Sequence, residues 1–282
     1  MNRVFLILSS LFLAFSVFSQ QPVRVQPIPI SQAEKTPGSQ WAGKKAAYLG
    51  DSMTDPNTSN YTTCWYWQYL KELLDLDYVV FARSGYQWNG ILQMAQRLYD
   101  ELGDSVDAVF IWAGTNDYNN SIPIGKFFTE TMQATIHNGT NVIRKHRTPV
   151  FSDSTFCGRI NKVMDFLKNK YPDKQIVIFT PIHRGYATFG STNVQPGEDF
   201  ANGQGLYLES YIDALKRAGE IWSVPIIDLF SLSGLYPLSD NHTQYIVNAE
   251  RDRLHPNALG HYRIAKTLQY QLLTLPCSFA IK

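Results

Sequence analysis

The 282-residue sequence is poor in cysteine, in net charge and in repeated or long apolar segments. Its three cysteines, Cys64, Cys157 and Cys277, have no zinc-cluster spacing. An oxidising compartment would permit one disulfide among them, but the sequence does not determine which pair forms, if any. With 25 Lys and Arg residues against 24 Asp and Glu, the formal net charge is +1. A nucleic-acid partner is therefore disfavoured, because binding phosphates requires a basic surface.

The composition nevertheless provides for a folded core. Hydrophobic residues make up 44% of the chain and charged residues 17%, which is typical of a globular protein and not of a disordered one. The length suits one large domain or two small ones. We expect a single domain over residues 44–282, and the sequence leaves its oligomeric state open.

One apolar run, over residues 4–18, follows a basic start at Arg3. This pattern predicts a secretory signal peptide over residues 1–19, so we expect a secreted or periplasmic protein. An uncleaved anchor is the alternative, although the run is short for a bilayer span, and no other segment is long enough to cross a membrane. No cysteine precedes Cys64, which excludes a lipid-modified cysteine at the cleavage point. Residues 20–43, with four prolines, are predicted to be an extended linker.

From Lys44 the pattern alternates between short, continuously apolar runs and stretches with helical periodicity. Strands are predicted at 45–49, 77–81, 107–112, 175–180 and 224–229. Helices are predicted at about 64–75, 89–101, 158–170, 205–222 and 256–274. This alternation predicts an α/β fold with a parallel sheet covered by helices on both faces. Residues 118–156 are expected to form a partly helical insertion, and long loops of this kind often shape or cover a site.

A serine, a histidine and an aspartate occur where they could meet. Ser52 directly follows the first predicted strand, and Asp252 and His255 lie far downstream. A serine hydroxyl needs a base to become a good nucleophile, and His255 could supply it, while Asp252 could accept a hydrogen bond from Nδ1 of that imidazole. Ligands bind at the carboxyl ends of strands in such sheets, which favours this interpretation. Alternatively, His255 only precedes a helix that starts at Pro256, and Asp252 is an ordinary loop carboxylate.

Two further blocks follow the second and third predicted strands. Gly85 follows the second, and Asn116, within Gly-Thr-Asn-Asp, follows the third. The amide of Asn116 and the backbone N–H groups of Ser52 and Gly85 could form an oxyanion hole. The alternative is that Asn116 and Gly85 only make turns. The position of each block at a strand end favours serine-dependent ester hydrolysis.

Together, these blocks resemble the SGNH, or GDSL, hydrolase family over about residues 44–275. The four name-giving residues correspond to Ser52, Gly85, Asn116 and His255, with Asp252 as the acid three positions before the histidine. The first block reads Gly-Asp-Ser-Met where the family name has leucine last. The resemblance implies a flavodoxin-like three-layer α/β/α fold with a five-stranded parallel sheet, no metal or other cofactor, and esterase or acyl-transfer activity.

The substrate is less well defined by the sequence. Asp51, Tyr86, Trp88 and His183 are candidate substrate contacts, because aromatic loop residues suit sugar rings and His183 lies just past the fourth predicted strand. We expect a small ester or an acetylated glycan, with carbohydrate O-deacetylation preferred. Short-chain lipid or aryl esters and acyl transfer are alternatives. A secreted carbohydrate-binding module with a relic site is a non-enzymatic alternative.

Overall fold

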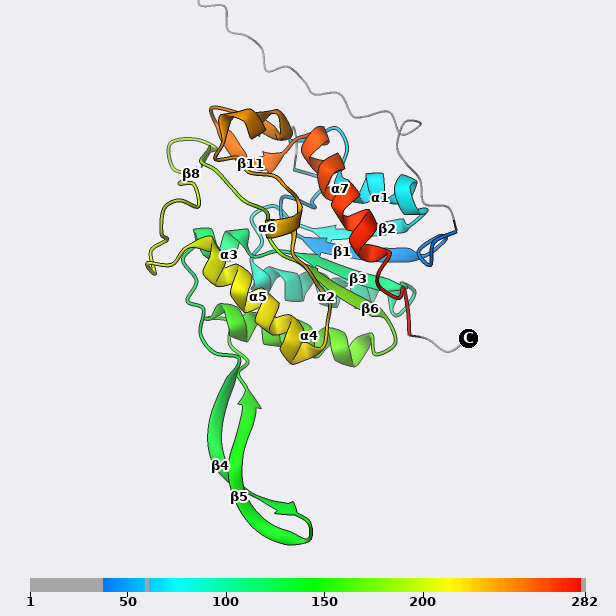
Figure 1. Cartoon of the computed structure of the whole chain (residues 1–282), viewed down its shortest axis with the longest axis vertical. Coiled ribbons are helices and arrows are strands. Elements are labelled where there is room, and N and C mark those ends of the chain that lie inside the picture. The colour runs from blue at the N-terminus through cyan, green and yellow to red at the C-terminus, as the bar shows by residue number, and fades with distance from the viewer. Residues whose placement is uncertain (1–37, 59–60, 280–282) are drawn as a thin grey trace, which may run out of the picture.

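The computed structural model describes residues 38–58 and 61–279 of the chain. Its centre is a five-stranded, all-parallel sheet with strand order β2-β1-β3-β6-β9 (Figure 1). The strands are β1 (Lys45–Gly50), β2 (Asp77–Ala82), β3 (Ala108–Trp112), β6 (Gln175–Phe179) and β9 (Ile226–Ile227). The helices are α1 (Tyr66–Leu74), α2 (Trp88–Leu102), α3 (Thr115–Asn119), α4 (Phe156–Lys170), α5 (Leu208–Trp222), α6 (Leu229–Leu232) and α7 (Ala258–Leu272).

Helices cover both faces of this sheet and make three layers. One apolar cluster joins the sheet to α2, α4 and α5, and a second joins it to α1 and α7. Every residue of β3 and β6 is buried, as expected for strands between two helical layers. The predicted α/β/α flavodoxin-like fold is therefore confirmed. Among the described residues, no helix is both long enough and apolar enough to span a membrane.

A second, smaller sheet lies above the carboxyl ends of the parallel strands (Figure 1). Its order is β10-β11-β7-β8, and its strands are β7 (Ala187–Thr188), β8 (Val194–Gln195), β10 (Ile246–Asn248) and β11 (Asp252–Pro256). The 3₁₀-helix η2 (Asp240–Tyr245) leads directly into β10. This sheet positions Asp252 and His255, since both lie on β11.

The predicted partly helical insertion is wrong over most of its length. Residues 118–156 instead contain a two-stranded antiparallel ribbon, β4 (Phe128–His137) and β5 (Thr140–Pro149), which we call the arm. Figure 1 shows the arm projecting away from the three layers. The predicted strand over 224–229 is also shorter than expected, because α6 begins at Leu229.

The predicted signal peptide and most of the predicted linker lie outside the described residues. The end of that linker is part of the fold, however. Trp41 is completely buried, its ring packs edge-on against Phe110 of β3, and its Nε1 donates to the carbonyl of Leu272 at 2.7 Å. The folded domain therefore begins before Lys44, which corrects the predicted boundary.

Candidate active site

The loop that carries Ser52 is a tight turn directly after β1. The backbone N–H groups of Thr54 and Asp55 both donate to the carbonyl of Asp51, so the chain reverses immediately. Gly50 is required there, because a Cβ at this position would lie 2.4 Å from Oγ1 of Thr54. The first glycine of the Gly-Asp-Ser block therefore permits the turn that contains Ser52.

Two aromatic residues of α1 hold this loop in place. The hydroxyls of Tyr66 and Thr54 are 3.0 Å apart, and Nε1 of Trp67 donates to the carbonyl of Thr54 at 3.1 Å. Both aromatic side chains are buried in the core. These two residues thus pack against the turn and fix its backbone.

Asp252 and His255 form a fixed pair on β11. Nδ1 of His255 lies 2.9 Å from Oδ2 and 3.1 Å from Oδ1 of Asp252. Oδ1 also accepts the backbone N–H groups of Leu254 and His255, at 3.1 and 3.0 Å. These bonds orient the carboxylate toward the imidazole, so Nδ1 carries the proton and Nε2 is left to accept one.

The structure brings Ser52 into line with this pair. Nε2 of His255 lies 2.9 Å from Oγ of Ser52, although the two residues are 203 positions apart. Ser52, His255 and Asp252 are 8%, 4% and 4% exposed. The hydroxyl, imidazole and carboxylate therefore form one continuous, nearly buried hydrogen-bonded chain, with Ser52 at its accessible end.

The block containing Gly85 lies beside Ser52. Gly85 has φ +79°, a left-handed conformation that favours glycine, and Oδ2 of Asp55 accepts the N–H of Ser84 at 2.9 Å. Within residues 38–58 and 61–279, the N–H groups of Ser52 and Gly85 donate to no other protein atom. These two N–H groups are thus unpaired among the described residues.

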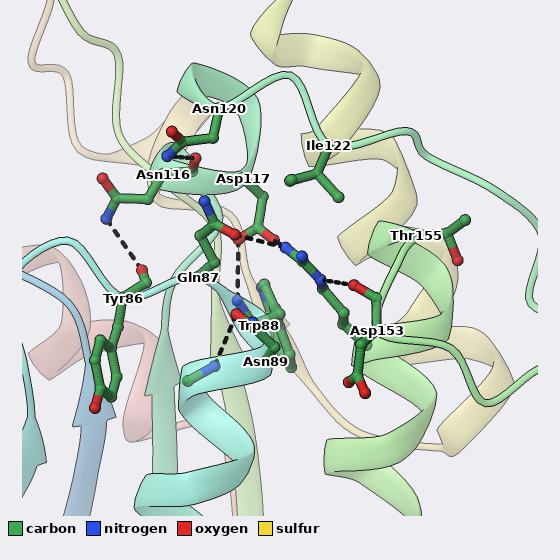
Figure 2. A network of polar contacts seen from close by, with 12 residues as sticks. Tyr86, Gln87, Trp88, Asn89, Asn116, Asp117, Asn120, Ile122, Asp153 and Thr155 are labelled. Atoms are coloured by element: carbon green, nitrogen blue, oxygen red, sulfur yellow. Dashed lines mark hydrogen bonds and ion pairs between the residues drawn. The ribbon is translucent and has the colours of Figure 1, made fainter.

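Asn116 lies at the start of α3, but its amide hydrogens are already in use. Nδ2 donates to Oδ2 of Asp51 and to the carbonyl of Tyr86, both at 3.1 Å (Figure 2 shows the second bond). A substrate oxygen would therefore take the place of the Tyr86 carbonyl before it could accept a hydrogen bond from Asn116.

A buried ion pair links α3 to α4. Arg159 of α4 donates from Nη1 to Oδ1 of Asp117 at 2.9 Å, and Oδ2 of Asp117 accepts the N–H of Trp88 at 3.1 Å (Figure 2). Burial raises the pKa of Asp117 to about 6, and Arg159 acts against this rise. The network ties together the ends of α2, α3 and α4 that surround Asn116.

Two predicted substrate contacts are wrong. Trp88 is completely buried in the core and approaches Phe156 edge-on, so no ligand can reach it. Asp51 is 1% exposed, and its carboxylate accepts the N–H of Met53 as well as the amide of Asn116. Burial raises the pKa of Asp51 to about 7. Asp51 therefore positions the site.

The other two predicted contacts stay predictions. Tyr86 is half-buried, and its ring covers Gly90 of α2, with its hydroxyl near Arg83 and Gln93. His183 is hydrogen-bonded through Nδ1 to Glu198, and its ring packs on Phe230 at a centroid distance of 3.7 Å.

Sequence reasoning missed the aromatic residues that cover His255. The ring of Tyr61 stacks on the imidazole at a centroid distance of 3.9 Å and an interplanar angle of 14°, and Phe189 meets it edge-on at 5.5 Å. Tyr61 lies in the segment that follows Ser52, but no sequence signal indicates that it contacts a residue near the other end of the chain. These rings limit rotation of the imidazole.

Arg184 was also missed as a link between the two halves of the site. Its fully buried guanidinium donates to Oγ1 of Thr115 at 3.1 Å and to Oε1 of Gln195 at 2.8 Å. Burial lowers its pKa to about 10. Arg184 thus joins α3, which carries Asn116, to the small sheet that carries His255.

In the part of the chain that the structure describes, no three His, Cys, Asp or Glu side chains cluster as metal ligands would. Cys64, Cys157 and Cys277 are free thiols, and burial raises the pKa of Cys64 to about 11 and that of Cys157 to about 12. The pairing that the sequence left open is therefore not formed.

Comparison with known proteins identifies the family. The model of the GDSL-like lipase/acylhydrolase family matches residues 48–263, which includes every block described above. The chain belongs to this family. No curated protein matches the sequence. Membership implies an ester hydrolase, which agrees with the reaction class expected from the sequence.

Solved structures support the fold assignment. A protein of Lactobacillus plantarum is 24% identical, with a TM-score of 0.64 over 83% of this chain and 98% of that one. A possible lipase from Chitinophaga pinensis is 20% identical, with a TM-score of 0.60 over 82% and 98%. A lipase/acylhydrolase from Enterococcus faecalis is 14% identical, with a TM-score of 0.50 over 83% and 98%. At these identities the similarity establishes the fold alone.

Proposed function

We propose that the protein is a serine esterase in which Ser52 is the nucleophile, His255 the general base and Asp252 the acid that orients it. The observation that carries this proposal is the hydrogen-bonded chain from Ser52 Oγ to His255 Nε2 and from His255 Nδ1 to Asp252, at 2.9 Å in each step. Both distances are within the reach that proton transfer requires.

The geometry supports a two-step acyl transfer. Oγ of Ser52 attacks the ester carbonyl while its proton passes to Nε2 of His255, and Asp252 stabilises the imidazolium that forms. The carbonyl oxygen becomes an oxyanion that accepts the N–H groups of Ser52 and Gly85. His255 then returns the proton to the leaving alcohol, and acyl-Ser52 remains. Water, activated by His255, releases the acid and restores Ser52.

The preferred substrate is an O-acetyl group on a carbohydrate. The nearly complete burial of Ser52 and His255, with Tyr61 and Phe189 packed against the imidazole, favours a short acyl group over a long one. Phe189 and Tyr186 are part-exposed on the same hairpin, and flat aromatic faces suit sugar rings. Short-chain lipid or aryl esters are the second candidate. Secretion, inferred from residues 1–19, is part of the proposal, and N-terminal sequencing of exported protein tests it.

Ester turnover by matched serine variants tests the proposal. We expect Ser52→Ala to abolish hydrolysis of p-nitrophenyl acetate and acetate release from acetylated glycans. Ser84→Ala should retain both, because its exposed side chain lies outside the hydrogen-bonded chain. Glycan binding without turnover, unchanged in Ser52→Ala, would contradict an esterase and favour a binding module. Faster turnover of longer acyl esters would contradict the acetyl preference alone.

A further inference from the structure

Tyr61 is held beside the triad from two sides. It lies between β1 and α1, and a turn directly after it leads the chain into that helix. In this turn Oγ1 of Thr62 donates to the carbonyl of Cys64 at 2.7 Å and accepts the N–H of Cys64 at 3.1 Å. From the other side, Phe189 of the β7–β8 loop approaches the ring of Tyr61 at a centroid distance of 6.2 Å. The N–H of Phe189 donates to the carbonyl of Asn193, which closes that loop.

The ring of Tyr61 lies face to face with the imidazole of His255. Their centroids are 3.9 Å apart, and their planes are inclined by 14°. Two neutral aromatic rings prefer offset or edge-on arrangements with centroids roughly 4.5–7 Å apart, because both faces carry negative charge density. A positively charged group within about 6 Å is instead attracted to the face of a phenol ring. The observed stack therefore suits the protonated form of His255 better than the neutral form.

Charged groups approach His255 at the edge of its ring, and Tyr61 covers a face. Asp252 and the serine hydroxyl are bound at the two ring nitrogens. His261 of α7 is close enough to repel an imidazolium, but burial lowers the pKa of His261 to about 3. Burial and the charge of Asp252 raise the pKa of Tyr61, and burial lowers that of Arg184, which interacts with Asp252, only to about 10. His261 and Tyr61 are therefore uncharged near neutral pH, and Arg184 is a cation.

We propose that Tyr61 is a positioning residue of the triad, and that its ring face stabilises the imidazolium of His255 that forms when Ser52 attacks. This inference rests on the proposed function. The proton passes from Oγ of Ser52 to Nε2 of His255 and then to the leaving alcohol, and Tyr61 neither gains nor loses one. A cation–π contact contributes more when it is desolvated, and His255 is 4% exposed. Tyr61 therefore acts together with Asp252, from the face of the imidazole instead of its edge.

The rate and pH profile of p-nitrophenyl acetate hydrolysis test this proposal. Tyr61→Leu keeps an apolar side chain without an aromatic face, and it should lower kcat by about 5–30-fold. It should also move the acid-side midpoint of the kcat/KM profile to lower pH, by about 0.7–1.5 pH units, because the imidazolium loses its stabilisation. Tyr61→Phe keeps the face, so its kcat should stay within about twofold of the wild type, with an unmoved midpoint. Tyr207→Leu, at the exposed N-cap position of α5, is the matched control and should behave as the wild type does.

A purely steric role of Tyr61 would give a different result. If its ring only limited rotation of the imidazole, Tyr61→Leu would lower kcat and leave the acid-side midpoint in place, and this outcome would overturn the proposal. A Tyr61→Phe protein as slow as Tyr61→Leu would also overturn it, since the hydroxyl would then be the group that matters. Far-UV circular dichroism and the thermal midpoint establish that the variants are folded.

Nuclear magnetic resonance of the histidines measures the same effect without turnover. The Cε1–H resonance of His255, identified among six histidines by its loss in His255→Asn, is titrated in the wild type and in both Tyr61 variants. Its midpoint should move to lower pH in Tyr61→Leu and not in Tyr61→Phe; an unmoved midpoint in Tyr61→Leu would overturn the proposal. This resonance also separates His255 from Asp51, whose pKa is about 7 and which binds Asn116. The expected shift in a protein that hydrolyses no ester would support the role of the stack and contradict the proposed function.

Discussion

The central sheet and the arm are both built from β-strands, but they are stabilised in different ways. All five residues of β3 are buried between two helical layers, whereas nearly all of β4 is exposed. The central sheet can therefore hold Ser52, Gly85 and Asn116 at fixed positions through packing on both sides. The arm is held at its base by Asn161 and by its own ladder of hydrogen bonds. The central sheet is therefore suited to holding catalytic groups at fixed positions, and the arm is suited to contact with another molecule.

The largest expected difference between the two regions is in turnover. Ser52→Ala or His255→Ala should lower kcat by a factor on the order of 10⁴–10⁶. Replacing residues 129–148 by a short loop should change kcat less than about twofold, because the arm supplies no group to the proposed triad. Steady-state hydrolysis of p-nitrophenyl acetate measures both. A large loss of kcat in the armless protein, with its fold intact, would contradict the separation of roles.

Ion pairs provide the second comparison. Removing one member of the buried Arg159–Asp117 pair, as in Arg159→Met, should lower the free energy of unfolding by about 3–5 kcal/mol, since Asp117 would keep a buried charge without its partner. Arg147→Met in the arm removes an exposed pair with Glu130 and should leave the unfolding midpoint unchanged. Chemical denaturation measures both variants. Equal losses in the two would mean that burial does not distinguish these pairs.

Two buried asparagines offer a third comparison. Asn116→Ala should lower kcat roughly 10²–10³-fold if its amide reaches the oxyanion during the reaction. A loss below threefold would remove Asn116 from that role. Asn161→Ala should leave kcat unchanged and lower the unfolding free energy by about 1–3 kcal/mol, because the carbonyls of Phe127 and Val150 would lose their buried donor. Kinetics and denaturation together distinguish the two effects.

The smallest expected effect is a pH dependence of stability in the domain. Burial lowers the pKa of His261 to about 3 from an ordinary value of 6.5, while its Nδ1 accepts the N–H of Tyr66. Between these two pKa values, His261 is protonated in the unfolded chain but neutral in the native state. The free energy of unfolding should therefore fall as the pH drops below 6.5. Asp51, whose pKa is raised from 3.8 to about 7, acts in the opposite direction over that range.

The variant His261→Asn isolates the histidine contribution. Asparagine keeps an acceptor for Tyr66 but cannot titrate, so the fall in thermal midpoint from pH 7 to pH 4.5 should be smaller than in the wild-type protein. An identical fall in both proteins would mean that His261 is not the group responsible.

Most of the domain could be predicted from the sequence because its strands are continuously apolar. The runs at 45–49, 107–112 and 175–180 correspond to β1, β3 and β6 with small shifts at their ends. Three site residues each follow the end of a strand: Ser52, Gly85 and Asn116. Their closeness to one another could therefore also be predicted from the topology of the sheet. His255 lies on a short strand of the small sheet, and that sheet was not predicted because its strands have only two to five residues.

The arm was not predicted, although β4 carries a period of two. From Thr129 to Ile136, threonine or glutamine alternates with other residues, but Glu130 interrupts the apolar series. Contacts that depend on tertiary structure could not be predicted at all. The stacking of Tyr61 on His255 joins residues 194 positions apart, and Trp88 was misassigned because its burial depends on Phe156 of α4.

Labelling with a fluorophosphonate tests the proposed nucleophile most directly. The intact mass of the wild-type protein should increase by one adduct, and fragmentation of the labelled peptide should locate it on Oγ of Ser52. The Ser52→Ala protein should take up none, and Ser84→Ala should be labelled as the wild type is. Ester turnover by a protein whose adduct lies on another residue, or by a protein that takes up no adduct, would contradict the assignment of Ser52.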